Sequence, residues 1–376
     1  MNLPNPYSSK NYKYLAIVPA VLFVLALGLI FFKGIPQGVD LRGGILLNIQ
    51  TNGVVDTIAL QKAVERVAPV SGIRTFQGPS GTGVEIEIEN NALLSAMEDR
   101  IKALQAKDSL LRELEVNASL TSDAAEITAL TQKQSSLNAE VLASSGQLLK
   151  ELNSSYVGSD GHASVKKAVE VYGNSQDSYR SAILAAVKGQ VGVAGHSFRE
   201  VGPSLSRFFL EKARDILLYS FILAALTVLI LFRSLVPSVA VIMGAVVDIV
   251  VTLGAMSLFN IPLSLASIAG LLMLIGFSLD TDVMLTMRVL KRKEGTANER
   301  AYGAFKTGAL MNLTTIGAFG VLALTGLYLQ VPTYFQIGIV ATIGGIIDFA
   351  ATWGANAVLV LKYAERLEAK RNLAIN

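Results

Sequence analysis

Long apolar runs separated by short polar turns fill the second half of the chain, and one more lies near the N-terminus. The first run covers about residues 14–32 without a charge, which is long enough to cross a ~30 Å hydrocarbon layer as a helix. Five more runs follow in close order, at about 216–232, 236–258, 263–287, 308–328 and 333–361. The pattern predicts six membrane-spanning helices, one followed by five.

The polar segment after the first run begins with the pattern of a small α/β domain. Residues 41–51 are strand-like, residues 55–68 place apolar side chains at helical spacing, and residues 72–78 and 83–89 are again strand-like. A short strand and turn are expected again over residues 197–206. The order β-α-β-β predicts a small α/β sandwich of the ferredoxin-like kind.

Residues 91–188 have a different composition, rich in Ala, Ser, Gln, Leu, Glu and Lys, with an apolar residue every three or four positions. This spacing predicts two or three long helices inserted into the α/β domain. The insertion is either a spacer that elaborates a loop or a specific binding arm. Asn117 and Asn153 each begin a short match to a glycosylation acceptor, a weak signal.

The chain therefore divides into five parts. Residues 1–33 form an N-terminal segment with the first span, 34–90 and 189–212 the α/β domain, 91–188 the helical insertion, 213–362 the five-helix membrane core, and 363–376 a tail.

Lysine and arginine in short loops predict the orientation, because such loops stay on the cytoplasmic side. Lys13 precedes the first span, Arg233 follows the second, and the loop between the fourth and fifth spans is strongly basic. All of these fall inside if the N-terminus is inside, which places both termini in the cytoplasm and the α/β domain outside the cell membrane. The alternative for the first span is a cleaved signal peptide, but no small-residue cleavage site follows it.

Composition supports a membrane protein and narrows its chemistry. The chain is 52% hydrophobic and 16% charged, and its net charge of +3 is small for 376 residues. The basic residues flank apolar runs instead of forming one broad patch, which argues against nucleic acid as a partner. With no cysteine and only two histidines, His162 and His196, we expect no metal site.

Four acids interrupt the apolar spans, which contain no central lysine or arginine. Asp248 lies near the middle of the third span, Asp348 near the middle of the sixth, and Asp280 and Asp282 near the end of the fourth. An ionised acid at the centre of a bilayer costs about 2.5–3.5 kcal/mol even on insertion scales, so these residues are functional candidates.

An internal repeat relates two of these acids. GAVVDIVVTLGA, from Gly244, and GGIIDFAATWGA, from Gly344, share Gly, Asp, Thr, Gly and Ala at the same offsets, 100 residues apart. The third and sixth spans run in opposite directions, so Asp248 and Asp348 are expected to meet near mid-membrane in an inverted repeat. The alternative is that small residues simply recur at packed helix interfaces.

Helical geometry separates Asp280 from Asp282 by about 200°. Asp282 shares a polar stripe with Ser278 and Thr286, so one of the two acids is expected to line a hydrated path while the other packs against a partner helix. Asn312 of the fifth span is expected to hydrogen-bond a carboxyl group or a chain of water molecules. The alternative for Asp282 is a simple ion pair with Arg288.

Three motifs resemble the SecD/SecF family of protein-export membrane proteins. They are GVDLRGG after the first span, VGPSLSRFFLEKA before the second, and GFSLDTDVMLTMRVLKR at residues 276–292. The first motif comprises Gly38, Asp40, Arg42, Gly43 and Gly44, whose paired glycines allow a turn that launches a strand. The resemblance covers both ends of the chain and fails across residues 91–188.

Within this family the chain is closer to archaeal SecF, with SecD as the second choice. Asp280 matches the membrane acid of SecD, whereas Thr281 stands where bacterial SecF has its acid. The resemblance implies an RND-type membrane core that assists secretion, driven by protons that pass Asp280 and, by proximity, Asp282. It implies as partners a SecD-like or SecF-like subunit, the Sec translocation channel and unfolded polypeptide, with no cofactor and no enzymatic activity.

Two other functions remain open. The same five-helix core resembles that of proton-coupled exporters of small apolar molecules, although those usually carry two cores in one chain. The other alternative is a structural scaffold for membrane subunits, in which the buried acids are dispensable.

Overall fold

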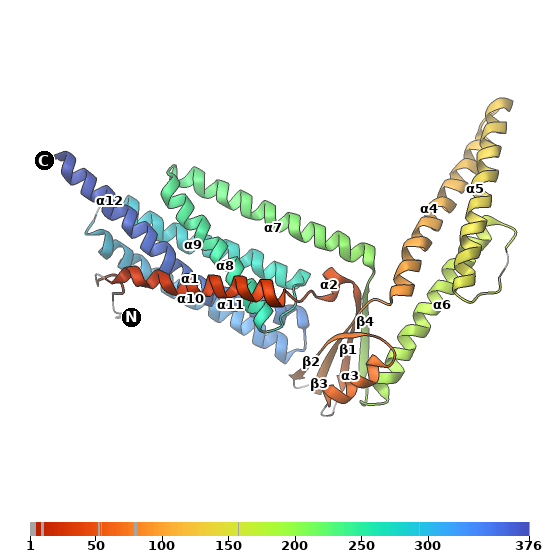
Figure 1. The fold of residues 1–376 in the computed structure, drawn as a ribbon, viewed down its shortest axis with the longest axis horizontal. Coiled ribbons are helices and arrows are strands. Elements are labelled where there is room, and N and C mark those ends of the chain that lie inside the picture. The colour runs from red at the N-terminus through yellow and green to blue at the C-terminus, as the bar shows by residue number, and fades with distance from the viewer. Residues whose placement is uncertain are drawn as a thin grey trace. The chain divides into compact units, whose positions relative to one another are not determined.

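The computed structural model describes residues 5–8, 11–51, 53, 55–78, 81–156, 158–292 and 294–375. The chain forms two compact units. The sheet unit consists of Gly43–Thr75 and Gly81–Ser206, and the membrane unit consists of Met1–Arg42, Phe76–Ser80 and Arg207–Asn376 (Figure 1).

The membrane unit contains six helices that are long and apolar enough to cross a bilayer, counted over the described residues, as the apolar runs predict. The first is α1 (Ile17–Lys33), which follows a short 3-10 turn at Tyr12–Ala16. The next four are α7 (Pro203–Phe232), α8 (Leu235–Leu258), α9 (Leu265–Lys291) and α10 (Ala297–Tyr328). The sixth is continuous but irregular, and comprises α11 (Pro332–Ala350), a π-helical turn (Ala351–Asn356) and α12 (Ala357–Ile375).

Local signals in the sequence set the ends of these helices. Arg233, Asn260 and Gln330 adopt positive φ angles of 52°, 54° and 56° after α7, α8 and α10, which stops each helix at a short turn. Ser264 begins α9 and Thr296 begins α10 with a capping box, in which the side chain satisfies a backbone N–H that the first helical turn leaves free.

The sheet unit has the predicted ferredoxin-like arrangement. Its elements are β1 (Gly44–Thr51), α3 (Thr57–Glu65), β2 (Val70–Gly78), β3 (Gly81–Ile88) and β4 (Gly195–Val201), with the sheet order β2-β3-β1-β4. Leu47 of β1 pairs with Ile86 of β3 on one side and with Phe198 of β4 on the other, both antiparallel. These side chains and Leu60 of α3 form one apolar core.

The insertion consists of three helices, α4 (Ala92–Leu120), α5 (Ala124–Glu151) and α6 (Gly161–Lys188). Asn91, Asp123 and Asp160 cap their N-termini with side-chain oxygens that accept backbone N–H groups. The helices share an apolar core of their own, and the C-terminal part of α6 also packs on the sheet through Ile183 and Val187. Helix α6 therefore belongs both to the insertion and to the α/β fold (Figure 1).

The paired glycines of the first motif make the turn that starts β1. A short helix, α2 (Val39–Arg42), precedes them, and φ is +82° at Gly43 and +140° at Gly44. A Cβ at Gly44 would collide with the backbone oxygen of Ile88. Only glycine fits both the backbone angle and the close approach of β3.

Candidate functional site

Three of the four membrane acids gather in the interior of the membrane unit. Asp248 of α8, Asp282 of α9 and Asp348 of α11 are 1%, 0% and 0% exposed, and Asp348 lies beside both of the others. The prediction that Asp248 and Asp348 meet is confirmed. Asp280 lies on the exposed face of α9, outside this cluster.

Asp348 is the most heavily hydrogen-bonded member of the cluster. Its Oδ2 accepts a 2.8 Å bond from the Asn312 amide of α10 and a 3.3 Å bond from the Thr281 hydroxyl of α9. On the other side of the cluster, the Ser278 hydroxyl donates to Asp248 at 2.5 Å. Four helices therefore contribute side chains to one polar site within apolar surroundings.

Thr352, in the π-helical turn, joins two of the acids. Its Oγ1 lies 2.7 Å from Asp282 Oδ1 and 3.0 Å from Asp348 Oδ1. A hydroxyl has one proton and can donate it to only one carboxyl group. Contact with both acids is therefore most favourable when one carboxyl group carries a proton and donates it to the Thr352 oxygen.

The electrostatics of the cluster point the same way. The middle of the spans contains no lysine or arginine, and three carboxylates in one buried site repel each other strongly in a medium of low dielectric constant. The mutual repulsion is relieved when a carboxyl group takes up a proton. The number of protons held is thus coupled to how closely the three side chains approach each other.

The repeat glycines position the helices around this cluster. A Cβ at Gly244 would collide with Asp282 Oδ2, and one at Gly344 would lie 2.6 Å from the side chain of Leu274, so both glycines seat α9. The second matched pair, Gly254 and Gly354, lets the N-terminal span pack closely. Gly254 faces Ala26, and Gly354 faces the chain just before α1. The matching positions of the two repeats therefore perform the same packing role.

The sequence predictions for the site have a mixed outcome. The polar stripe of α9 is confirmed, since Ser278, Asp282 and Thr286 are all fully buried. The ion pair between Asp282 and Arg288 is not formed. Arg288 is long enough to reach α10, where its Nη1 donates to the Gly303 oxygen and the Thr307 hydroxyl, each at 2.9 Å.

The sequence patterns did not reveal two features of the site. Asn356 lies beside Asp282, and the π-helical turn that carries Thr352 interrupts the sixth span. Asn356 is eight positions after Asp348, which puts both on one face of a helix, so this spacing was a usable signal. The turn has no sequence signature of comparable clarity.

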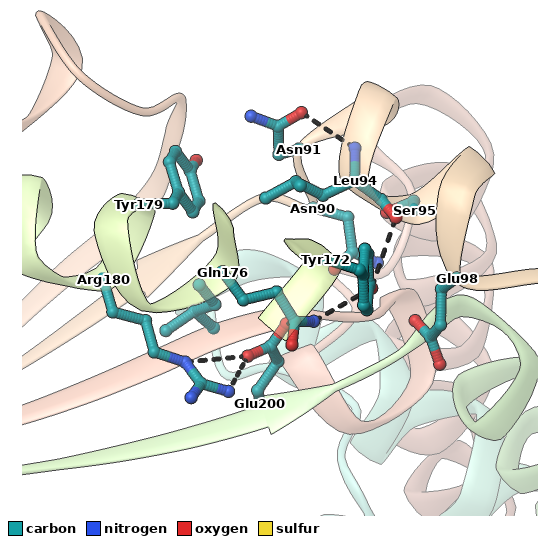
Figure 2. Close-up of a pocket in the computed structure, with 11 residues that line it drawn as sticks. Asn90, Asn91, Leu94, Ser95, Glu98, Tyr172, Gln176, Tyr179, Arg180 and Glu200 are labelled. Atoms are coloured by element: carbon teal, nitrogen blue, oxygen red, sulfur yellow. Dashed lines mark hydrogen bonds and ion pairs between the residues drawn. The ribbon is translucent and has the colours of Figure 1, made fainter. Parts of the chain in front are cut away.

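A second polar cluster lies in the sheet unit where α4 and α6 meet β4. Arg180 of α6 binds Glu200 of β4, and the Gln176 amide donates to Glu200 at 3.3 Å and to the Tyr172 hydroxyl at 2.9 Å (Figure 2). The Tyr172 hydroxyl in turn donates to the Leu94 oxygen at 3.3 Å. The space between these side chains is about 10 Å³, room for about one water molecule, and the hydrogen bonds anchor α6 to α4 and β4.

Comparison with known proteins assigns the family. The C-terminal family model of protein export membrane proteins SecD/SecF matches residues 182–366. The protein-export membrane protein SecF of Methanothermobacter thermautotrophicus is 31% identical over 95% of this chain and 94% of its own. SecF of Methanocaldococcus jannaschii is 28% identical over 96% of this chain and 99% of its own.

The fold has a solved counterpart. The crystal structure of SecDF from Thermus thermophilus, described as a translocon-associated membrane protein, matches with a TM-score of 0.52 at 15% identity. The match covers 95% of this chain and 59% of the Thermus chain, so this chain spans less than two thirds of that protein. The resemblance seen in the motifs is thereby confirmed, and both full-length relatives carry the SecF name. The chain belongs to the SecD/SecF family of protein-export membrane proteins.

Proposed function

We propose that the chain is an accessory subunit of the Sec protein-export machinery, and that proton movement through the acid cluster drives its action. The observation that carries the proposal is the Thr352 hydroxyl held between Asp282 and Asp348, a geometry that is most favourable with a proton on one of the two acids. The names of the archaeal relatives support the export role.

The proposal gives each acid a role. Asp348 is the central proton carrier, because Thr281, Asn312 and Thr352 all contact it. Asp248 and Asp282 are its exchange partners on either side. Asp280, on the exposed face of α9, faces a partner helix, since an acid in the hydrocarbon layer needs a polar partner.

The proposed partners rest on the family to which the chain belongs. A SecD-like subunit completes the membrane assembly, the Sec channel supplies the path, and the sheet unit acts on unfolded polypeptide outside the cell membrane, with both termini in the cytoplasm. The basic loops that predict this orientation support this arrangement.

The test replaces single acids by asparagine, which keeps their size. Cells depleted of the native protein are complemented with Asp348→Asn or Asp282→Asn, and secretion of a signal-bearing reporter is measured. We expect secretion to fall to the level of depleted cells, because a neutral amide cannot load and release a proton. Asp177→Asn, an exposed substitution in α6, is the matched control and is expected to secrete normally.

The outcomes separate the alternatives. Normal secretion by both membrane variants contradicts proton coupling and favours a structural scaffold. Intact secretion together with lost resistance to toxic apolar molecules favours a small-molecule exporter. Asp280→Asn tests the partner-facing role, for which we expect weaker copurification of a second membrane subunit with the chain.

A further inference from the structure

The sixth span contains an irregular turn at the point where it meets the acid cluster. Over Ala351–Asn356 the helix is π-helical, and the Ala357 N–H donates to the Thr352 oxygen five residues earlier. Turns of this kind are rare and occur mostly at functional sites. Because Thr352 lies within the turn, the conformation of the turn decides where its hydroxyl stands relative to Asp282 and Asp348.

A residue from the N-terminal segment holds this turn by a hydrogen bond. The Tyr7 hydroxyl donates to the backbone oxygen of Trp353 at 2.9 Å, although the two residues are 346 positions apart. Tyr7 is 0% exposed, and burial raises its pKa, so the hydroxyl stays a donor. A buried bond to a backbone oxygen next to Thr352 restrains the same peptide units that place the threonine.

Close packing makes the restraint specific. A Cβ at Gly354 would lie 2.8 Å from the Leu15 oxygen and 3.3 Å from Pro19 Cδ, so glycine admits the N-terminal chain directly onto the turn. The rings of Tyr7 and Trp353 both contact Phe305 edge-on, with centroids 6.4 Å and 5.3 Å from it. The turn is thus enclosed by the N-terminal segment on one side and α10 on the other.

We propose that Tyr7 is a positioning residue for the membrane acid cluster, acting through the Trp353 carbonyl and the π-helical turn on the Thr352 hydroxyl. The inference deepens the proposed function and rests on it only for its consequence in export. Tyr7 lies outside every apolar run and outside the three family motifs, so the sequence patterns gave it no role.

The first experiment uses the single tryptophan of the chain. Full-length protein labelled with carbonyl-¹³C tryptophan has one isotope-shifted amide band, which reports the Trp353 carbonyl alone. In reconstituted protein we expect this infrared band to shift in Tyr7→Phe, which loses only the hydroxyl. The matched control is Tyr12→Phe, whose hydroxyl donates to Glu365 at 3.0 Å instead, and its band is expected to stay in place.

The second experiment tests whether loss of the Tyr7 hydroxyl changes the titration of the aspartates in the cluster. The carboxyl band of protonated aspartate is followed against pH in the wild type, in both tyrosine variants and in Asp348→Asn, which identifies the band. We expect Tyr7→Phe to move the titration midpoint by about half to one pH unit, since that is equivalent to one typical hydrogen bond. Tyr12→Phe is expected to titrate like the wild type.

An unmoved Trp353 band in Tyr7→Phe overturns the contact, and an unmoved aspartate titration overturns the positioning role. If Tyr7→Phe does not fold, the wild type decides, because its Trp353 band must shift as the acids titrate, and a band that stays in place overturns the positioning role. Neither readout depends on secretion. A shifted titration with normal secretion by the Asp348 variant would therefore refute the proposed function and leave this inference standing.

Discussion

At the scale of single residues, the site depends on positions that have no side chain. Gly244 and Gly344 let α9 approach both repeat helices, and the carboxyl group of Asp282 occupies the space that a Cβ at Gly244 would need. The acid cluster is therefore specified as much by repeat glycines as by the acids. A methyl group at position 244 would therefore act directly on the geometry of the Asp282 carboxyl group.

Gly244→Ala is expected to displace Asp282 and to destabilise the protein by about 1–3 kcal/mol, the usual cost of overpacking a tight interior. Thermal unfolding of the purified chain and reporter secretion measure the two effects. Gly276→Ala on α9 is the matched control, because its Cβ would point into open space. Equal behaviour of the two variants would show that the contact with Asp282 has no consequence.

At the scale of elements, the helical insertion contains a titratable contact between two of its helices. His162 of α6 lies between Asp108 and Glu115 of α4, with ring nitrogens 2.5 Å and 3.2 Å from their oxygens. Arg112 also pairs with Asp108, and Gln134 of α5 donates to Glu115. The contact ties α6 to α4 near the point where α6 begins.

The charge state of His162 is expected to control how firmly these helices are joined. Burial lowers its pKa, but bonds to Asp108 and Glu115 outweigh burial and raise it above the usual 6.5. A raised folded-state pKa contributes stability that is complete below about pH 6.5 and is lost as pH rises through the folded value. Amide exchange in α4 and α6 of the full chain, corrected for intrinsic rates, should therefore be faster at high pH.

His162→Gln should remove this pH dependence, because a neutral amide keeps hydrogen bonds but cannot titrate. His196→Gln, on the exposed face of β4, is the control and should behave like the wild type. Exchange in α4 that slows as pH rises would contradict the assignment.

At the scale of the whole molecule, the sequence predicts the features that arise from periodic spacing of apolar residues and from the repeat. Six spans and the βαββ order follow from apolar spacing, and the meeting of Asp248 with Asp348 follows from the inverted repeat. The role of Tyr7 could not be predicted, because a lone aromatic residue gives no sign of a partner 346 positions away. The pairing of Arg288 with α10 was missed for a related reason, since a long side chain reaches several alternatives.

The orientation of the chain can be tested cleanly because it contains no cysteine, so each introduced thiol is the only one. We expect Ser135→Cys, exposed on α5, to react with a membrane-impermeant maleimide added to intact cells. Glu294→Cys, exposed in the basic loop between α9 and α10, should react only after the cells are opened. The reverse pattern would invert the orientation inferred from the basic loops.

The π-helical turn overlaps the last part of the internal repeat. The matching residues end at Ala255 and Ala355, one position before the turn itself ends at Asn356. Such a turn takes up about one residue more than an α-helical turn, so every later side chain is rotated by about 100° from its place in an unbroken helix. Deleting one residue within 353–356 would remove the extra residue and the turn together, so that Glu365 would keep its place beside Tyr12 while the backbone that positions Thr352 would change.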